Sequence, residues 1–281
     1  MMCPRLLPFL LSLGLTGCVP DTLEPPPPGA EIAVVSHLGF GREEPEGQSL
    51  GHDLDGRVSG EDDVEGCGVA DLTHVLTGEQ GIDNSFAGLL PALELAGAGP
   101  LEDLIQNSVL SGELLILLEM EGRNDPTTEC IDLTMTRAVG PPRLGGDGEI
   151  LPGQTFDRDL EAPSAQVPCA QESGSMLRGE ELELRLPLRV FDEFIDITLY
   201  RGIIEAEMSE DGRMTGVISG GLSVLELEQN VAALDGIGDQ IPALIGPLLD
   251  ANADLAPTGF GSCSELSVVL TFEAVSAYVF D

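Results

Sequence analysis

The chain of 281 residues contains no lysine and no tryptophan, so all 12 of its basic side chains are arginines. It carries 49 acidic side chains, and its formal net charge is -37 at pH 7. Binding of nucleic acid requires basic side chains that displace the counterions of the phosphates, so we expect no nucleic-acid partner. Aromatic residues make up only 4% of the chain, which argues against sugar sites built from stacked tryptophan rings.

Motifs of the common enzyme classes are also missing. The three histidines, His37, His52 and His74, form no HExxH zinc motif. Ser262 lies in Gly-Phe-Gly-Ser-Cys, which is not the GxSxG nucleophile elbow. The glycines after Ser219 lack the spacing of a dinucleotide-binding loop, and there is no Walker lysine. We therefore expect neither nucleotide binding nor enzymatic activity.

The sequence has no apolar run long enough to span a membrane, and its most apolar stretch lies at the N-terminus. There, Arg5 precedes an apolar stretch that ends at Leu15-Thr16-Gly17-Cys18. The stretch is shorter than the ~20 apolar residues of a membrane-spanning helix and has the size of a signal peptide. Its last four residues resemble the lipobox of bacterial lipoproteins, a resemblance limited to the first 18 residues.

This resemblance implies that residues 1–17 are a signal peptide, and that Cys18 becomes the N-terminus and carries the lipid, including a palmitate-type acyl chain. The lipid would anchor the protein to a membrane of the cell envelope. Val19, which is not acidic, favours sorting to the outer membrane. The folded domain would then lie in the periplasm or at the cell surface.

Four further cysteines remain once Cys3 leaves with the signal peptide. An even number of cysteines in an exported chain predicts disulfides, here two, with three possible pairings. Their spacing is too wide for a CxxC-type zinc site. The four are Cys67, Cys130, Cys169 and Cys263.

Residues 18–51 are rich in Pro, Gly and Glu and are predicted to form a tether, although Ile32–Val35 could be a short strand. Hydrophobic residues make up 42% of the whole chain, which is enough for a core. We expect one domain over residues 52–281. Its predicted parts are an acidic loop at 52–66, helices at 84–107, a β-rich region at 111–222, helices at 223–251 and a final strand at 264–281.

The apolar pattern underlies this division. Apolar residues recur three or four positions apart in the two helical regions, whereas Leu182–Val190 alternates with charged residues as a half-buried strand does. Leu114–Leu118 and Ile131–Met135 flank a turn-like segment and predict a hairpin. We predict an α+β fold with a mostly antiparallel sheet, either a sandwich or a curved sheet, and a few helices packed on one face or end.

The segment from Gly51 to Asp62 resembles a calcium-binding loop of the EF-hand type, in the dockerin variant with aspartate at the twelfth position. The first ligand position holds Gly51, which has no side chain, and Gly66-Cys67-Gly68 interrupts the helix that should follow. The resemblance therefore covers the loop alone and implies no cohesin partner. A solvated acidic turn without an ion is the alternative. The ligands implied by the resemblance are Asp53, Asp55, Ser59 and Asp62.

A weaker calcium candidate has oxygen ligands at the same alternate spacing, but Leu255 stands where the loop needs glycine. It comprises Asp250, Asn252 and Asp254.

Taken together, these patterns predict a lipid-anchored lipoprotein of the cell envelope that acts as a non-enzymatic binding or structural module. Calcium is the expected cofactor, and the partner is an unknown envelope protein. The first alternative is a carrier of lipid or another hydrophobic ligand in a pocket between sheet and helices. A secreted acid-base hydrolase is the second, and would need two carboxylates facing each other across a cleft.

Overall fold

The computed structural model describes residues 30–44, 47–95, 101–123, 129–190, 193–209, 211–233, 240–259 and 261–280. The expected signal peptide and Cys18 lie outside these residues.

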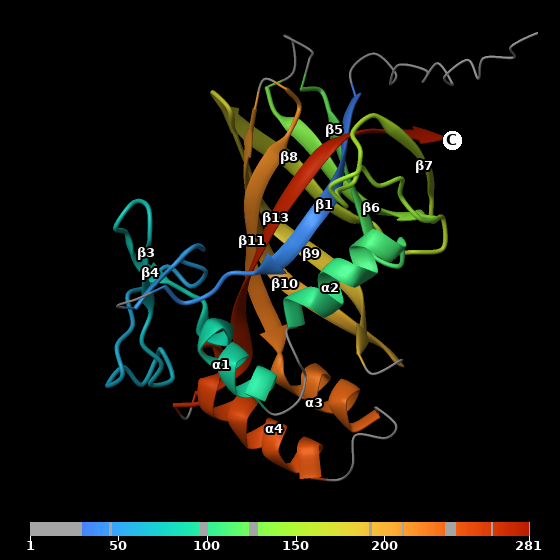
Figure 1. The fold of residues 1–281 in the computed structure, drawn as a ribbon. Helices are drawn as coiled ribbons and strands as arrows, with labels where there is room; N and C mark the ends of the chain where they lie inside the picture. The colour runs from blue at the N-terminus through green and yellow to red at the C-terminus, as the bar shows by residue number, and fades with distance from the viewer. Residues whose placement is uncertain are drawn as a thin grey trace, which may run out of the picture.

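Eight strands form a closed antiparallel barrel (Figure 1). Pairing of β1 with β13 and of β6 with β8 closes the sheet, so it has none of the free edges of an open sheet. This confirms the predicted α+β class. In order around the barrel, the strands are β1 (Ala30–Phe40), β5 (Leu115–Glu121), β6 (Ile131–Val139), β8 (Ala165–Ser173), β9 (Met176–Val190), β10 (Glu193–Met208), β11 (Met214–Ser223) and β13 (Cys263–Phe280).

Shorter strands surround the barrel. Strand β7 (Gln154–Arg158) pairs with β6 and runs parallel to the end of β13, while β12 (Leu255–Pro257) pairs with its beginning. A separate small sheet lies beside the barrel wall (Figure 1). It consists of β2 (Gln48–Ser49), β3 (Leu72–His74) and β4 (Gln80–Ile82).

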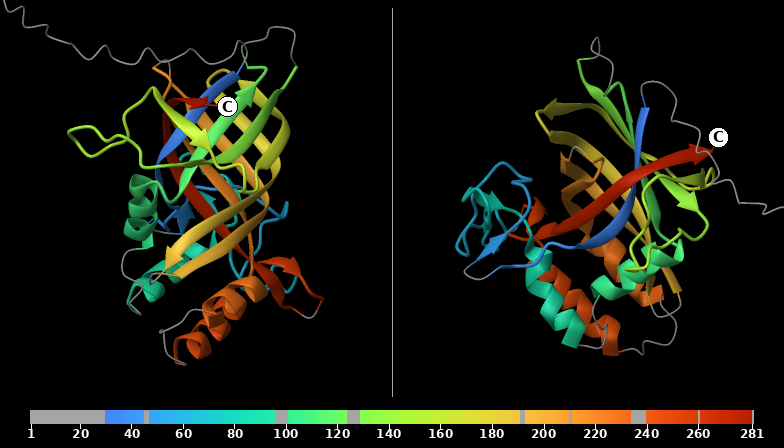
Figure 2. Two further views of the ribbon diagram at one scale, coloured as in Figure 1. Left: turned by 90° about the vertical axis from the view of Figure 1, so that its right-hand side faces the viewer. Right: turned by 45° about the horizontal axis from the view of Figure 1, so that its top comes forward.

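The helices lie in the two regions predicted from the apolar spacing. In Figure 1, α1, α3 and α4 gather at one end of the barrel and α2 lies alongside it, and the views in Figure 2 agree. The side chain of Gln106 on α2 binds the main chain of β1, through bonds to the Ser36 oxygen and the Leu38 nitrogen. The helices are α1 (Ser85–Leu93), α2 (Leu101–Ser111), α3 (Val224–Ala233) and α4 (Gln240–Asn252).

The prediction of a tether over residues 18–51 is wrong for its second half. Residues 30–40 form β1, which pairs with both β5 and β13 in the barrel wall. Ile32–Val35 and Leu38 are buried in the core. The proline- and glycine-rich surroundings obscured this strand, but its β-branched residues suit a sheet.

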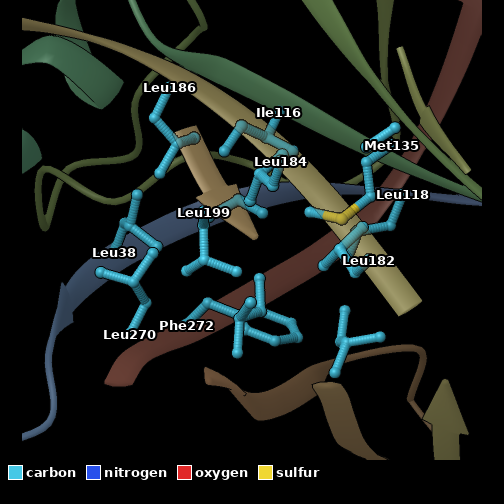
Figure 3. Close-up of a cluster of buried hydrophobic side chains, with 14 of the residues drawn as sticks. Leu38, Ile116, Leu118, Met135, Leu182, Leu184, Leu186, Leu199, Leu270 and Phe272 are labelled. Atoms are coloured by element: carbon cyan, nitrogen blue, oxygen red, sulfur yellow. The ribbon is translucent and has the colours of Figure 1, made fainter. Parts of the chain in front are cut away.

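Apolar side chains fill the inside of the barrel (Figure 3). On β9, alternate residues Leu182, Leu184 and Leu186 are buried, as the alternation predicted. Gly216 makes room for an aromatic ring, because a Cβ there would lie 2.7 Å from Cζ of Phe272.

Two disulfides are present, Cys67–Cys263 and Cys130–Cys169. The structure thus confirms that the four cysteines pair and selects one of the three pairings. Disulfides are typical of proteins outside the reducing cytoplasm, so they indicate an extracytoplasmic domain. Among the described residues, no helix has the length and apolarity needed to cross a membrane.

Candidate functional site

Residues 47–84, the part of the chain that follows β1 and precedes α1, are here called the docked segment. They fold against the outside of the barrel (Figure 1). Nδ1 of His52 lies 2.8 Å from the hydroxyl of Ser219 on β11. Nδ2 of Asn84 donates to the Gly41 oxygen at 3.0 Å and to the Ser49 hydroxyl at 2.8 Å. The disulfide from Cys67 to β13 adds a covalent link. These contacts hold the segment in one position on the barrel.

Three carboxylates of the docked segment converge. Asp53, Asp55 and Asp83 each offer an oxygen within 4.8 Å of the other two, and no other acidic, histidine or cysteine side chains in the described part of the chain form such a group of three. Asp53 and Asp55 lie in the predicted acidic loop, whereas Asp83 directly follows β4. This group, here called the acidic triad, can hold a metal ion.

Main-chain hydrogen bonds position the acidic triad. Oδ1 of Asp53 accepts from the nitrogens of Gly56 at 2.6 Å and Arg57 at 3.1 Å, and Oδ1 of Asp55 accepts from Arg57 at 3.0 Å. Gly56 allows this turn through its positive φ of 77°. Oδ2 of Asp83 accepts from the Leu54 nitrogen at 2.6 Å. The loop is therefore folded around its carboxylates, and Asp83 binds it from the position directly after β4.

Within the described part of the chain, no arginine forms an ion pair with the acidic triad, although the charge of Arg57 opposes the rise in the pKa of Asp55. Burial raises the pKa of Asp83 to about 8, and the charges of Asp254, Asp71 and Asp55 add to this effect, while the hydrogen bond from Leu54 opposes it. Burial is also the main cause of the raised pKa of Asp55. The nearest arginine, Arg57, forms its ion pairs with Asp63 and Glu65. A bound cation would remove the cost of holding these carboxylates charged.

The structure brings together two of the four ligands implied by the loop resemblance, Asp53 and Asp55. Asp62 is not a member of the triad. The buried hydroxyl of Ser59 makes no hydrogen bond to a described residue. The Ser59 side chain faces Gly66: a Cβ added to Gly66 would lie 2.5 Å from the Cβ of Ser59. Asp83 was missed because it lies outside the loop; its only signal was an acid directly before the helical region predicted at 84–107.

The weaker calcium candidate does not form a loop. Asp250 and Asn252 lie on α4, and Nδ2 of Asn252 donates to the Leu248 oxygen at 2.8 Å. Both carboxylate oxygens of Asp254 accept hydrogen bonds from Ser267, one of them from its nitrogen at 2.7 Å. Burial raises the pKa of Asp254 to about 6, although these hydrogen bonds oppose the shift. Asp254 therefore joins the turn after α4 to β13.

Where the docked segment meets the barrel, the imidazole of His52 lies between the side chains of Ser219 and Glu205. Nδ1 of His52 contacts Ser219, and its Nε2 lies 3.8 Å from Oε2 of Glu205. Burial, followed by the charge of Arg178, lowers the pKa of His52 to about 4, although Glu205 opposes this. Ser219 is completely buried, so no substrate can reach its hydroxyl. The arrangement fits a structural contact, not a nucleophile.

Two cavities bear on ligand binding. An apolar cavity of about 50 Å³ lies between the helices and the end of the barrel, with Phe40, Phe86 and Leu227 in its lining. A cavity of roughly 150 Å³ can hold benzene, and this one is much smaller, so it has no room for an acyl chain. An open groove of about 450 Å³ separates the docked segment from the barrel wall, and this volume is in the range of small-molecule sites.

No family model, curated protein or solved structure matches this chain. Function must therefore follow from the chemistry of the acidic triad, the groove and the cysteines.

Proposed function

We propose that this protein is a lipid-anchored lipoprotein of the cell envelope whose folded domain is a non-enzymatic binding or structural module stabilised by calcium. The observation that carries the proposal is the convergence of Asp53, Asp55 and Asp83 at the point where the docked segment folds back on itself. An ion there would link the loop to the end of β4 and hold the segment in shape.

The ligand chemistry favours calcium. The triad offers carboxylate oxygens and neither histidine nor cysteine, and hard cations prefer such ligands. Calcium accepts irregular coordination and can complete its shell with waters and main-chain oxygens, whereas magnesium demands near-octahedral geometry. The Asp53-Leu54-Asp55-Gly56 turn is also the part of the sequence that resembles an EF-hand loop.

The proposed location rests on two independent features. The Leu15-Thr16-Gly17-Cys18 sequence supports lipidation of Cys18 and attachment to a membrane, and the two disulfides fit an extracytoplasmic domain. The filled barrel interior gives little support to the carrier alternative, because the apolar cavity holds about 50 Å³. Burial of Ser219 removes a candidate serine nucleophile, whereas the acid-base hydrolase alternative depends on paired carboxylates and stays a separate prediction.

Thermal unfolding of the mature chain carrying Cys18→Ser, in excess calcium and then in chelator, tests the proposal. We expect calcium to raise the unfolding midpoint. Asp83→Asn should abolish this response without unfolding the protein in chelator, because asparagine can still accept the hydrogen bond from Leu54 and resembles the protonated acid. Asp53→Ala/Asp55→Ala should abolish the response as well.

The matched control is Glu149→Ala/Glu161→Ala, which removes two exposed carboxylates from other loops. It should keep the full calcium response. If calcium has no effect on the unmodified sequence, or if the control loses the response as the triad variants do, calcium does not bind at the triad and the proposal fails.

A further inference from the structure

The groove beside the docked segment has the barrel wall as its floor. Its lining residues on the wall belong to strands that are neighbours in the sheet, so the strand registers determine their positions. One row across the sheet consists of residues directly opposite one another: His37 on β1, Glu273 on β13, Thr215 on β11, Glu207 on β10 and Met176 on β9. All five line the groove.

A second row lies two residues further along the same strands. It places Thr271 beside Val217, and Val217 beside Glu205. The floor therefore presents three glutamates, and Thr215 and Val217 on β11 separate Glu273 from the two on β10. Because adjacent strands lie about 4.8 Å apart, Glu207 and Glu273 stand roughly 10 Å apart with Thr215 between them.

Two of these glutamates have no counter-ion among the residues that the structure describes. Glu205 contacts Arg178 at 3.2 Å and lies 3.8 Å from His52. The side chains of Glu207 and Glu273 form no hydrogen bond or ion pair with any described residue, and both are exposed to the groove. The opposite wall, from the docked segment, is partly apolar and includes Leu50 and Leu76, and Leu76 is 80% exposed.

We propose that this groove binds a linear aliphatic diamine or polyamine. Ammonium groups would pair with Glu207 and Glu273, and the methylene chain between them would lie over Thr215 and Val217 and against the leucines of the docked segment. Chains with ammonium groups roughly 6–10 Å apart match the carboxylate spacing. The inference rests on the proposed function as a binding module, and it names the class of ligand.

Other cations fit this groove less well. A metal ion needs ligand atoms that converge, and the groove's carboxylates and imidazoles form no converging group of three in the described part of the chain. A basic peptide usually gains affinity by adding a strand to a free sheet edge. The floor strands β9, β10, β11 and β13 are each paired on both sides, and on the outer edge of β1 Gln106 binds the Ser36 oxygen and the Leu38 nitrogen. A peptide main chain would therefore find no free sheet edge there.

Isothermal titration of the calcium-loaded mature chain carrying Cys18→Ser, in about 0.15 M NaCl to screen diffuse attraction, tests the inference. The probes are butane-1,4-diamine, hexane-1,6-diamine, spermidine and the monoamine butylamine. We expect at least one diamine or spermidine to bind about tenfold more tightly than butylamine. Glu207→Gln/Glu273→Gln should weaken that binding about tenfold or more, whereas Glu149→Gln/Glu161→Gln, with the same change in charge, should alter it less than about twofold.

Equal binding of monoamine and diamines, or equal losses in the two double variants, would show only diffuse attraction to an acidic surface and would overturn the inference. So would tighter binding of a Lys-Gly-Lys peptide than of every diamine. The calcium shift of the unfolding midpoint, measured on the same samples, separates the two proposals. If that shift persists without diamine binding, the groove inference alone fails, whereas loss of the shift in the unmodified chain rejects the calcium-stabilised module.

Discussion

At the scale of single residues, the junction between docked segment and barrel depends on a histidine that is neutral in the folded state. His52 is 7% exposed and contacts the buried Ser219 hydroxyl. Burial and the nearby Arg178 disfavour its charged form, which is why its pKa falls to about 4. Protonation would place a charge where the fold provides little solvation.

We expect His52 to make stability depend on pH between about 4 and 6.5. In this window the unfolded chain binds a proton on His52 and the folded chain does not, so the free energy of unfolding falls as pH decreases, by on the order of 3 kcal/mol over the full window. Above pH 6.5 this contribution is fully present. Urea unfolding at several pH values, compared between the unmodified chain and His52→Gln, measures it.

His74→Gln is the control, because His74 is only partly buried. The His52 variant should show a flatter dependence on pH than both the control and the unmodified chain. Identical slopes for all three proteins would mean that His52 is not held neutral.

Glycines give a second prediction at this scale. A Cβ at Gly216 would lie 2.4 Å from the main-chain oxygen of Glu205 and 2.7 Å from Cζ of Phe272. A Cβ at Gly88, on the exposed side of α1, meets nothing within 4 Å. Gly216→Ala should therefore cost about 1–3 kcal/mol of stability through overpacking. Gly88→Ala should stabilise by roughly 0.5–1 kcal/mol through helix propensity. Chemical denaturation of both variants checks the opposite signs.

At the scale of elements, an ion pair attaches β7 to the barrel. Arg158 on β7 binds both carboxylate oxygens of Glu119 on β5, at 3.0 and 2.6 Å, and Thr136 on β6 donates to the same carboxylate at 2.7 Å. Burial favours the neutral acid, but the bonds from Arg158 and Thr136 outweigh it and lower the pKa of Glu119. Three strands thus meet at one charged contact.

Replacing Arg158 alone should lower the free energy of unfolding more than replacing both Arg158 and Glu119. Arg158→Met leaves a buried carboxylate without its partner, and we expect a loss of about 2–4 kcal/mol in the free energy of unfolding. Glu119→Met/Arg158→Met should lose less, because no unpaired charge remains. A double-mutant cycle by chemical denaturation measures the difference. A double variant less stable than Arg158→Met would contradict this account.

At the scale of the whole molecule, the two disulfides link different parts of the fold and close loops of different length. Cys130–Cys169 joins the residue directly before β6 to β8, where the barrel closes, and spans 39 residues of sequence. Cys67–Cys263 spans 196 residues and ties the docked segment to β13. The longer closed loop restricts the unfolded chain more, in the entropic account of disulfide stabilisation.

Cys67→Ser/Cys263→Ser should lower the free energy of unfolding by about 2–5 kcal/mol. It should also increase hydrogen exchange of the amides in β3 and β4, because the docked segment loses its covalent link. Exchange in β5 and β6 should rise only as far as global stability falls. Unchanged exchange in the docked segment would show that its noncovalent contacts suffice.

The amino-acid sequence by itself determined the local elements. Alternation over Leu182–Val190 predicted β9, apolar spacing predicted the helices, and the two cysteine pairs followed from even number and expected export. These signals are short-range, since side-chain periodicity reflects which face of one element is buried. The pairing of Asp53 with Asp55 could likewise be predicted from the sequence, because both lie in one turn.

Only the tertiary structure decided how distant segments meet. The prediction of a sandwich or curved sheet left open that β1 and β13 pair to close a barrel, and composition placed β1 in a tether. The choice of cysteine partners and the approach of Asp83 to the loop depend on where the docked segment lies. The alignment of Glu207 with Glu273 across β11 depends on strand registers. Strand pairing between residues far apart in sequence is set by packing of the whole core, and no local pattern records it.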